Sequence, residues 1–306
     1  MTRALLITNP FAARADAKTV TAVLKILSRG GWNVDLRTIE GPGDARRIAE
    51  ESLDQGFEVM VSHGGDGTAM QVAAAIAGSG IALGVVPGGT GNVLAANLRL
   101  PRTSTGAARA LLKAHSHSID LGVVQRSDGA HYFAVVAGTG FDAELMAATD
   151  RAFKRRWKFA AYIARAAMTL ASVRSAPHRV TVDGATQEIR AAMLLVLNCG
   201  QLPPGFLKLH ADLSPDDGWL DVVALDADGA FQSASALFEL LIGNRNGKRR
   251  RVWWSRGRAV SVEVMDSTAR PVQLDGEVTG TTPFEARVLP RALAVLVGPA
   301  FKAHDG

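Results

Sequence analysis

The sequence has little of what secreted or membrane-spanning proteins need. Its 306 residues contain a single cysteine, Cys199, so no disulfide can form within the chain. A lone cysteine favours a reducing compartment. The first apolar run, residues 4–7, is too short for the core of a signal peptide. We therefore expect a cytoplasmic protein.

No uncharged stretch is suited to crossing a membrane. The longest, residues 67–98, is interrupted repeatedly by glycines and by Pro87, whereas a spanning helix needs about 20 predominantly apolar residues. The hydrophobic fraction of 47% nevertheless excludes intrinsic disorder. A length of 306 residues corresponds to about two domains.

Strand and helix signals alternate through the first third of the chain. Such alternation favours parallel strands joined by crossover helices, which form an open α/β sheet. The expected strands cover residues 3–8, 33–38, 58–62 and 81–86, and the expected helices cover 19–29, 44–55 and 70–77.

From residue 118 onward, short apolar runs are separated by Gly, Asp and Pro turns, as is typical of an antiparallel sandwich. We predict an α/β domain over residues 1–117 and a β-rich sandwich over residues 118–289. The expected strands of the second part cover residues 118–124, 132–137, 179–182, 191–198, 220–225, 259–264, 284–288 and 293–297, and two helices cover 158–172 and 230–242.

The stretch His63–Thr68 (HGGDGT) follows an expected strand and precedes an expected helix. Its three glycines let backbone N–H groups approach a phosphate closely, and the helix N-terminus adds a partial positive charge. Asp66 could then meet a Mg²⁺ ion or a ribose hydroxyl. A tight strand–helix turn without a ligand is the alternative, and this stretch alone does not decide between them.

A second glycine-rich stretch, Pro87–Asn92 (PGGTGN), follows the next expected strand. In an open parallel sheet both loops emerge at the carboxyl edge, where ligands bind. Two glycine-rich turns facing one crevice favour a phosphate site over packing alone. The P-loop motif GxxxxGK[ST] is absent, and no GxGxxG follows the first strand, which argues against a P-loop enzyme and a Rossmann dinucleotide site.

Five motifs occur in order along the chain: Asn9-Pro10, GGDGT at 64–68, PGGTGN at 87–92, GTGFD at 138–142 and LDGE at 274–277. Together they resemble the diacylglycerol kinase-type lipid kinases, a group that includes bacterial diacylglycerol kinases, sphingosine kinases and ceramide kinases. The resemblance covers nearly the whole chain. GGDGT alone is shared with NAD kinases, whereas the ordered set is specific.

The resemblance implies an NAD kinase/diacylglycerol kinase-like fold with ATP in the cleft between the domains, and residues 290–306 returning to complete the nucleotide-binding domain. The residues that it assigns to ATP are Asn9, Thr38, Gly64, Gly65, Asp66, Gly67, Thr68, Gly89, Thr90 and Asn92.

The resemblance also implies that Asp275 is the catalytic base and that Glu277 assists with metal or base. From spacing alone Asp275 is a hairpin-turn residue, because Asp-Gly is a strong turn signal. Phosphoryl transfer mainly needs positioning and charge neutralisation. We therefore expect ATP and Mg²⁺ as cofactors, with Asp66 as a metal ligand.

The segment Ser214–Trp219 resembles a structural Mg²⁺ site of some bacterial members. In that site Asp217 would supply a carboxylate, and Ser214 and Trp219 would supply backbone carbonyls. Oxygen ligands suit Mg²⁺, although such a sequence is also an ordinary turn. Two positions depart from the family: Gln71 replaces a usual acidic residue and Val93 replaces an aspartate. The number of metal ions therefore stays open.

Two segments without acidic residues carry 12 of the 34 basic residues, and the remainder has 22 basic and 29 acidic residues. Basic residues beside tryptophan and phenylalanine favour contact with an anionic membrane surface over a solvated face. The residues concerned are Arg151, Lys154, Arg155, Arg156 and Lys158 with Phe153, Trp157 and Phe159, and Arg245, Lys248, Arg249, Arg250, Arg251, Arg256 and Arg258 with Trp253 and Trp254.

These observations predict an ATP- and Mg²⁺-dependent lipid kinase that associates peripherally with a membrane. Diacylglycerol is the expected substrate, because bacterial members of the resembled family often use it. Phosphatidylglycerol, sphingoid bases, ceramide and polyprenols stay open, as does a homodimer. We expect no nucleic-acid partner, since no recognisable module is present. The alternatives are an NAD kinase-like enzyme, an inactive nucleotide-binding regulator and a nucleic-acid-binding protein.

Overall fold

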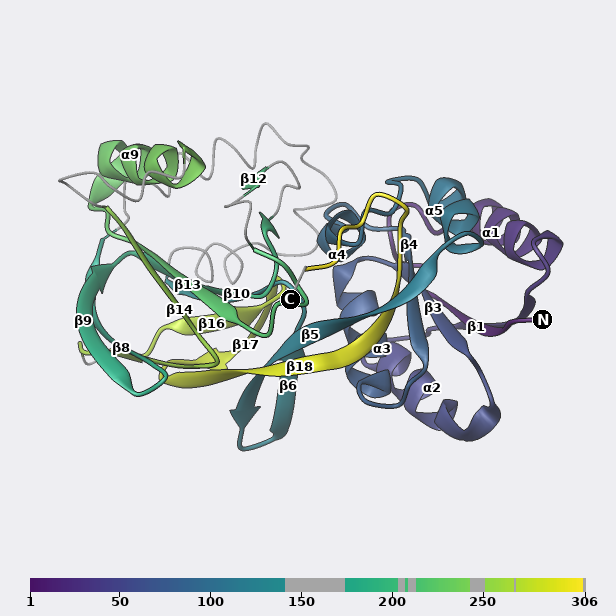
Figure 1. Cartoon of the computed structure of the whole chain (residues 1–306), viewed down its shortest axis with the longest axis horizontal. Helices are drawn as coiled ribbons and strands as arrows, with labels where there is room; N and C mark the ends of the chain where they lie inside the picture. Colours follow the sequence, from purple (N-terminus) through teal and green to yellow (C-terminus); the bar gives the residue numbers. More distant parts are fainter. Residues whose placement is uncertain (141–173, 203–206, 209–212, 243–250, 267, 305–306) are drawn as a thin grey trace.

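The computed structural model describes residues 1–140, 174–202, 207–208, 213–242, 251–266 and 268–304. An α/β part and a β-sandwich part lie side by side, and two long strands run from one to the other (Figure 1). In the described ranges, no helix combines the length and apolarity needed to cross a membrane.

The α/β part contains a parallel sheet in the order β2-β1-β3-β4. Helices α1 and α5 cover one face, and α2 and α3 cover the other (Figure 1). Its elements are β1 (Arg3–Thr8), α1 (Ala17–Arg29), β2 (Asn33–Thr38), α2 (Asp44–Glu51), η1 (Leu53–Gln55), β3 (Val59–Gly64), α3 (Asp66–Ile76), β4 (Ala82–Pro87), α4 (Val93–Asn97) and α5 (Ser104–Leu111).

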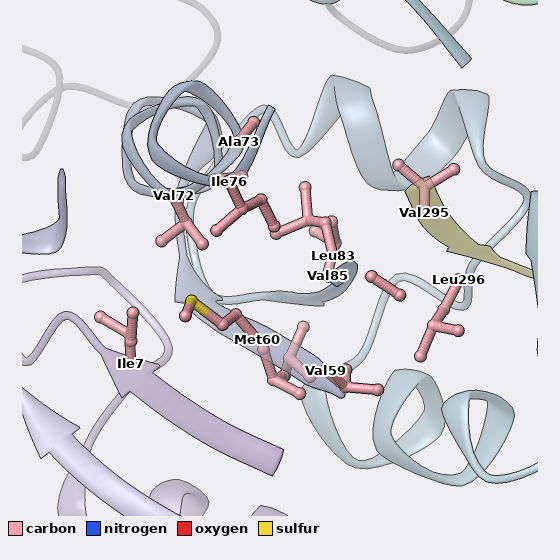
Figure 2. Packing of buried hydrophobic residues seen from close by; sticks show 14 of the residues in the cluster. Ile7, Val59, Met60, Val72, Ala73, Ile76, Leu83, Val85, Val295 and Leu296 are labelled. Atoms are coloured by element: carbon pink, nitrogen blue, oxygen red, sulfur yellow. The ribbon is translucent and has the colours of Figure 1, made fainter. Parts of the chain in front are cut away.

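The core of this part explains why its strands are continuously apolar. Every residue of β3 and β4 is buried, because helices cover both faces of the sheet. Val72 and Ile76 of α3 face Leu83 and Val85 of β4 (Figure 2). This packing fixes α3, whose first three residues complete the GGDGT motif, against the sheet.

The sandwich part consists of antiparallel strands and helix α9. Its elements are β5 (His115–Arg126), β6 (Gly129–Phe133), β7 (Val136–Gly140), β8 (Ala176–Val182), β9 (Ala185–Ala191), β10 (Met193–Leu197), β11 (Gln201–Leu202), β12 (Leu207–Lys208), β13 (Leu220–Leu225), α9 (Gly229–Ile242), β14 (Val252–Gly257), β15 (Ala259–Val264), β16 (Pro271–Leu274), β17 (Glu277–Thr281) and β18 (Phe284–Val297).

The two parts share a sheet. Among the described residues, ten strands form one sheet in which β18 pairs with β15 at its start and with β4 at its end, where Val295 lies opposite Leu83. Strand β5 accompanies β18 along both stretches, with a register shift between Leu289 and Leu293. Six further strands, in the order β14-β13-β10-β7-β16-β17, form the second layer of the sandwich.

The predicted fold class is confirmed, with differences in detail. The expected strand 132–137 is interrupted at Ala134 and Val135, and the expected strands 284–288 and 293–297 are one bent strand. Strands β9 and β17 were not expected, because their exposed, polar sequences lack an apolar pattern. The domain limits 1–117 and 118–289 stay a prediction, since β5 passes through residue 117. The expected helix 158–172 lies outside the described residues.

Candidate functional site

The carboxyl ends of the parallel strands bring the expected nucleotide residues to one edge of the sheet. Thr8 of β1 lies opposite Thr38 of β2 on one side and opposite His63 of β3 on the other. Gly64 of β3 lies opposite Pro87 of β4. The loops after β1, β3 and β4 therefore emerge together, as ligand-binding loops do in open α/β sheets.

The two glycine-rich loops touch each other directly. The Gly88 and Gly89 N–H groups both donate to the Gly64 carbonyl, at 2.7 and 3.1 Å. A Cβ atom on Gly89 would lie 2.7 Å from the Gly65 Cα, closer than two carbon atoms that are not bonded approach in folded proteins. Glycine is therefore required at residue 89 by the close approach of the Gly65 backbone.

Side chains of the expected set tie these loops to their neighbours. Asn9 Nδ2 donates to Thr68 Oγ1 at 3.0 Å, which links the loop after β1 to α3. Asn92 Nδ2 donates to the Gly89 carbonyl at 2.7 Å, while Asn92 Oδ1 accepts from the Gly89 N–H at 3.0 Å. These contacts hold the loops rigid around the crevice.

Asp66 begins α3, and its Oδ1 accepts from the Leu94 N–H at 3.1 Å. Burial raises the pKa of its carboxyl group, and backbone hydrogen bonds oppose that rise. A Cβ on Gly91 would lie 2.9 Å from Asp66 Oδ2, so the glycine leaves space beside this oxygen. Asp66 thus joins the first glycine loop to the second through Oδ1, and its Oδ2 lies beside Gly91.

Thr90 and Thr38 lie in different hollows. Thr90, Gly91 and Asn92 border one that also includes Arg14 and Arg102. Thr38 borders another with Arg37, Glu40 and Arg47. Sequence reasoning did not single out Arg14 and Arg102, because isolated arginines carry no motif, although their charge suits phosphate.

His63 lies beneath the first glycine loop and is fully buried. Its Nδ1 lies 3.3 Å from Thr8 Oγ1. Burial lowers the pKa of the imidazole to about 4, so His63 is neutral near pH 7. The residue beneath the first glycine loop is therefore uncharged.

Asp275 occupies the first position of the two-residue turn between β16 and β17. The backbone φ angles of Asp275 and Gly276 are 48° and 90°, as a tight hairpin turn requires. The carboxylate accepts from the N–H groups of Ala134, Val135 and Val136 at 2.7, 3.0 and 2.8 Å. Asp275 is therefore both a turn residue and a carboxylate fixed at the junction of β6 and β7.

Burial raises the pKa of Asp275 to about 7, and the negative charge of Asp66 acts in the same direction. The three backbone donors oppose this rise because they favour the carboxylate. The charge of Asp66, in the α/β part, thus acts on the Asp275 carboxyl group, in the sandwich part. A carboxyl group with a pKa near 7 is suited to general base chemistry.

Glu277 lies beside the first turn of α3, since a Cβ on Gly67 would collide with Glu277 Oε1. The intervening hollow is bordered by α3 and by the β16–β17 hairpin. Its lining includes Met70, Gln71, Ala74, Tyr132, Leu274 and Thr279, together with Gly67, Asp275 and Glu277. The structure therefore brings both expected catalytic carboxylates to the same cleft as the GGDGT motif.

The position of Asp66 allows it to act as a single protein ligand of a metal ion. Within the described residues, no group of three or more His, Cys, Asp or Glu residues could hold a metal by itself. Mg²⁺ usually binds through one or two carboxylates together with substrate phosphates and waters. Asp66, a single carboxylate between the two glycine loops, is suited to this role.

At the second expected metal site, Asp217 Oδ1 accepts from the Trp219 N–H at 3.0 Å. Its Oδ2 is buried and lies 3.6 Å from Arg256 Nη2. The Ser214 hydroxyl donates to Asp216, whose other oxygen lies 2.7 Å from His117 Nε2. The positive charge beside Asp217 is thus the Arg256 guanidinium. A structural Mg²⁺ bound by Ser214, Asp217 and Trp219 stays a prediction.

Two family models match the chain. The diacylglycerol kinase catalytic domain matches residues 3–124, and the YegS C-terminal NAD kinase beta sandwich-like domain matches residues 134–297. The crystal structure of a diacylglycerol kinase from Bacillus anthracis str. Sterne has a TM-score of 0.75, with 21% identity and coverage of 97% of both chains. At that identity, the likeness shows the fold.

Two relatives align over most of their lengths. A diacylglycerol kinase of Mycobacterium tuberculosis strain H37Rv is 30% identical, covering 95% of this chain and 93% of the relative. A protein of Pseudomonas aeruginosa strain UCBPP-PA14 named "Probable lipid kinase YegS-like" is 32% identical, covering 92% and 90%. Fold and sequence together define a two-domain kinase. The chain belongs to the diacylglycerol kinase family.

The close approach of the glycine loops predicts the effect of one methyl group. Gly89→Ala should lower ATP affinity by roughly 10-fold or more, about 1.4 kcal/mol, because the new Cβ displaces the loop from Gly65. Gly41→Ala is the matched control, since a Cβ there meets no atom within 4 Å. Calorimetric titration of both variants checks this, and equal ATP affinities would contradict it.

Proposed function

We propose that this protein transfers the γ-phosphate of ATP to the hydroxyl of diacylglycerol, giving phosphatidic acid, with Asp275 as the general base. The observation that carries the proposal is the position of Asp275, which lines one hollow with Gly67 of the GGDGT motif and is close enough to Asp66 for its charge to act on the pKa of Asp275. The names of the relatives support a lipid acceptor, and diacylglycerol in particular.

In the proposed reaction, the acceptor hydroxyl loses its proton to the Asp275 carboxylate as its oxygen attacks the γ-phosphorus. The bond from phosphorus to the bridging oxygen breaks, and ADP leaves. The three N–H donors at Ala134, Val135 and Val136 fix the carboxylate before the substrate arrives. Such preorganisation lowers the cost of orienting the base in the transition state.

The glycine loops supply backbone N–H groups for phosphate, and Asp66 supplies a carboxylate for Mg²⁺. When bound, the metal neutralises negative charge on the phosphates. Glu277 lies beside Gly67 and is assigned to assist the base or the metal. These assignments make ATP and Mg²⁺ the proposed cofactors.

Asp275→Asn tests the general base. Removing it should lower kcat by a factor of roughly 10² to 10⁴. Asp183→Asn is a closely matched control: Asp183 also has a φ of 48° in an Asp-Gly hairpin turn, and its carboxylate also accepts from backbone N–H groups, those of Arg258 and Ala259. Asp183, however, lies on an exposed turn outside the cleft.

The measurement is transfer of labelled γ-phosphate to lipids in mixed micelles, with diacylglycerol, phosphatidylglycerol, sphingosine, ceramide and undecaprenol as acceptors. Equal loss of activity in both variants would assign Asp275 a structural role. NAD⁺ is included as a soluble acceptor, and label on it would favour an NAD kinase-like activity. ATP binding without any transfer would favour a nucleotide-binding regulator.

The raised pKa of Asp275 predicts a pH dependence. The base must be ionised, so kcat/KM for the lipid should fall about 10-fold per pH unit below the pKa of about 7. An aspartate at its ordinary value of 3.8 would leave activity constant down to about pH 5. We expect the acid limb at saturating ATP to have its midpoint near pH 7, and a flat profile down to pH 5 would contradict this.

We further propose that the basic, aromatic segments hold the protein at an anionic membrane surface. Residues 151–158 and 245–250 lie outside the described residues. Of the rest, Arg256 forms a two-point ion pair with Asp221, and the Arg258 guanidinium lies 4.7 Å from the Trp219 ring centroid. These two arginines stabilise the sandwich, so residues 151–158 and 245–250 carry the membrane proposal.

Membrane binding can be measured by sedimentation with phosphatidylserine vesicles. Replacing Lys154, Arg155 and Arg156 together by alanine should weaken binding by on the order of 100-fold, since each basic residue contributes about 1 kcal/mol near an anionic leaflet. Arg37, Lys18 and Lys25 replaced together provide a control of equal charge change. Equal weakening in both triple variants would show a general effect of net charge instead.

A further inference from the structure

Two of the peptide groups that hold Asp275 are fixed by contacts on their other side. The N–H groups of Val135 and Val136 belong to the peptide groups whose carbonyl oxygens are those of Ala134 and Val135. A peptide group is planar and trans, so its N–H and its C=O point in opposite directions. The partners of these two carbonyls therefore set the direction in which the two N–H groups meet the Asp275 carboxylate.

The partners of both carbonyls are Asn198 and Cys199. These residues directly follow β10, which pairs with β7. Asn198 Nδ2 donates to the Ala134 carbonyl at 2.9 Å, and Cys199 Sγ donates to the same carbonyl at 3.0 Å. The Asn198 N–H donates to the Val135 carbonyl at 2.9 Å. Asn198 and Cys199 thus lie on the far side of the peptide groups that anchor the proposed base.

Both side chains are buried and act as donors. Asn198 is 2% exposed and Cys199 is fully buried. Asn198 Nδ2 also donates to the Asp120 carbonyl at 2.9 Å, and two carbonyls beside one atom require the amide nitrogen there, because only a donor suits both. Burial raises the pKa of the Cys199 thiol well above its usual value, and the negative charge of Asp275 acts in the same direction. The thiol is therefore protonated, as a donor must be.

We propose that Asn198 and Cys199 are positioning residues of the phosphoryl transfer, because they orient the two peptide groups that hold Asp275 in place. A carbonyl that accepts a hydrogen bond also polarises its own peptide group, which strengthens the N–H on the other side. The inference rests on the proposed role of Asp275 as the general base. It adds a layer of residues behind the base that no substrate touches.

Asn198→Leu is the principal test, since it keeps the approximate size of the side chain but removes the amide donor. A displacement of about 1 Å in an active site can cost 10²-fold, so kcat for diacylglycerol should fall roughly 10- to 100-fold. The KM for ATP should stay unchanged, because the glycine loops belong to the other part of the molecule. Ser175→Ala is the matched control: Ser175 Oγ also donates to a backbone carbonyl of the sandwich, that of Ala227, at 3.2 Å, and its loss should leave kcat unchanged.

A double-mutant cycle separates positioning from a general loss of structure. If Asn198 acts through Asp275, adding Asn198→Leu to Asp275→Asn should lower the residual kcat no further. A loss in the double variant equal to the product of the two single losses would overturn the inference, since Asn198 would then act independently of the base. A rise in the KM for ATP that matches the fall in kcat would overturn it as well.

Cys199 provides a second test that does not depend on the folding of Asn198→Leu. Cys199→Ala removes the thiol donor and should lower kcat by less than Asn198→Leu does, because a thiol is a weak donor. Cys199→Ser restores a donor and should recover most of the loss. Equal kcat values for Cys199→Ala and wild type, or equal losses in both Cys199 variants, would contradict the inference.

Failure of the proposed function would give a different result. If wild type transferred phosphate to no lipid, or if Asp275→Asn kept the full kcat, the general base would be refuted and the positioning role with it. Full activity of Asn198→Leu and Cys199→Ala beside a strong loss in Asp275→Asn would refute only the positioning role and leave the kinase activity in place.

Discussion

The position of the cleft walls depends on β18. This strand pairs with β4 of the α/β part and with β15 of the sandwich, so one hydrogen-bonded sheet runs through both parts. The six-stranded layer that carries Asp275 packs against the sandwich end of this sheet, with Phe284 and Leu274 in their shared core. The register shift between Leu289 and Leu293 bends the sheet between the two parts. A flexible linker would leave the distance between Asp66 and Asp275 undefined, whereas a shared sheet fixes it.

Two Asp-Gly turns show how surroundings determine what a residue can do. Asp183 and Asp275 have the same backbone angle, and both receive backbone N–H donors. Asp275 differs because it lies in a cleft where burial and the charge of Asp66 raise its pKa. The same backbone φ angle is therefore compatible with a structural carboxylate and with the proposed general base.

The sequence allowed much of the α/β part to be predicted, because buried parallel strands are continuously apolar and their glycine loops are distinctive. Strand β17 could not be predicted, since its sequence, EVTGT, is short and largely exposed. Asn198 carries no motif, and its hydrogen bonds to the main chain appear only after folding. Arg256 suggested a membrane patch, yet Asp221, 35 residues away in sequence, pairs with it. Such long-range pairing leaves no local pattern.

The donors that hold Asp275 belong to the main chain at Ala134, Val135 and Val136. Every amino acid except proline provides the same N–H group. Their side chains are accordingly free to drift during evolution, within the limits of packing, without loss of the carboxylate's anchor. Proline is the one residue that the anchor itself forbids at these positions. The sequence therefore encodes this anchor by the absence of proline at residues 134–136, and not by any particular side chain there.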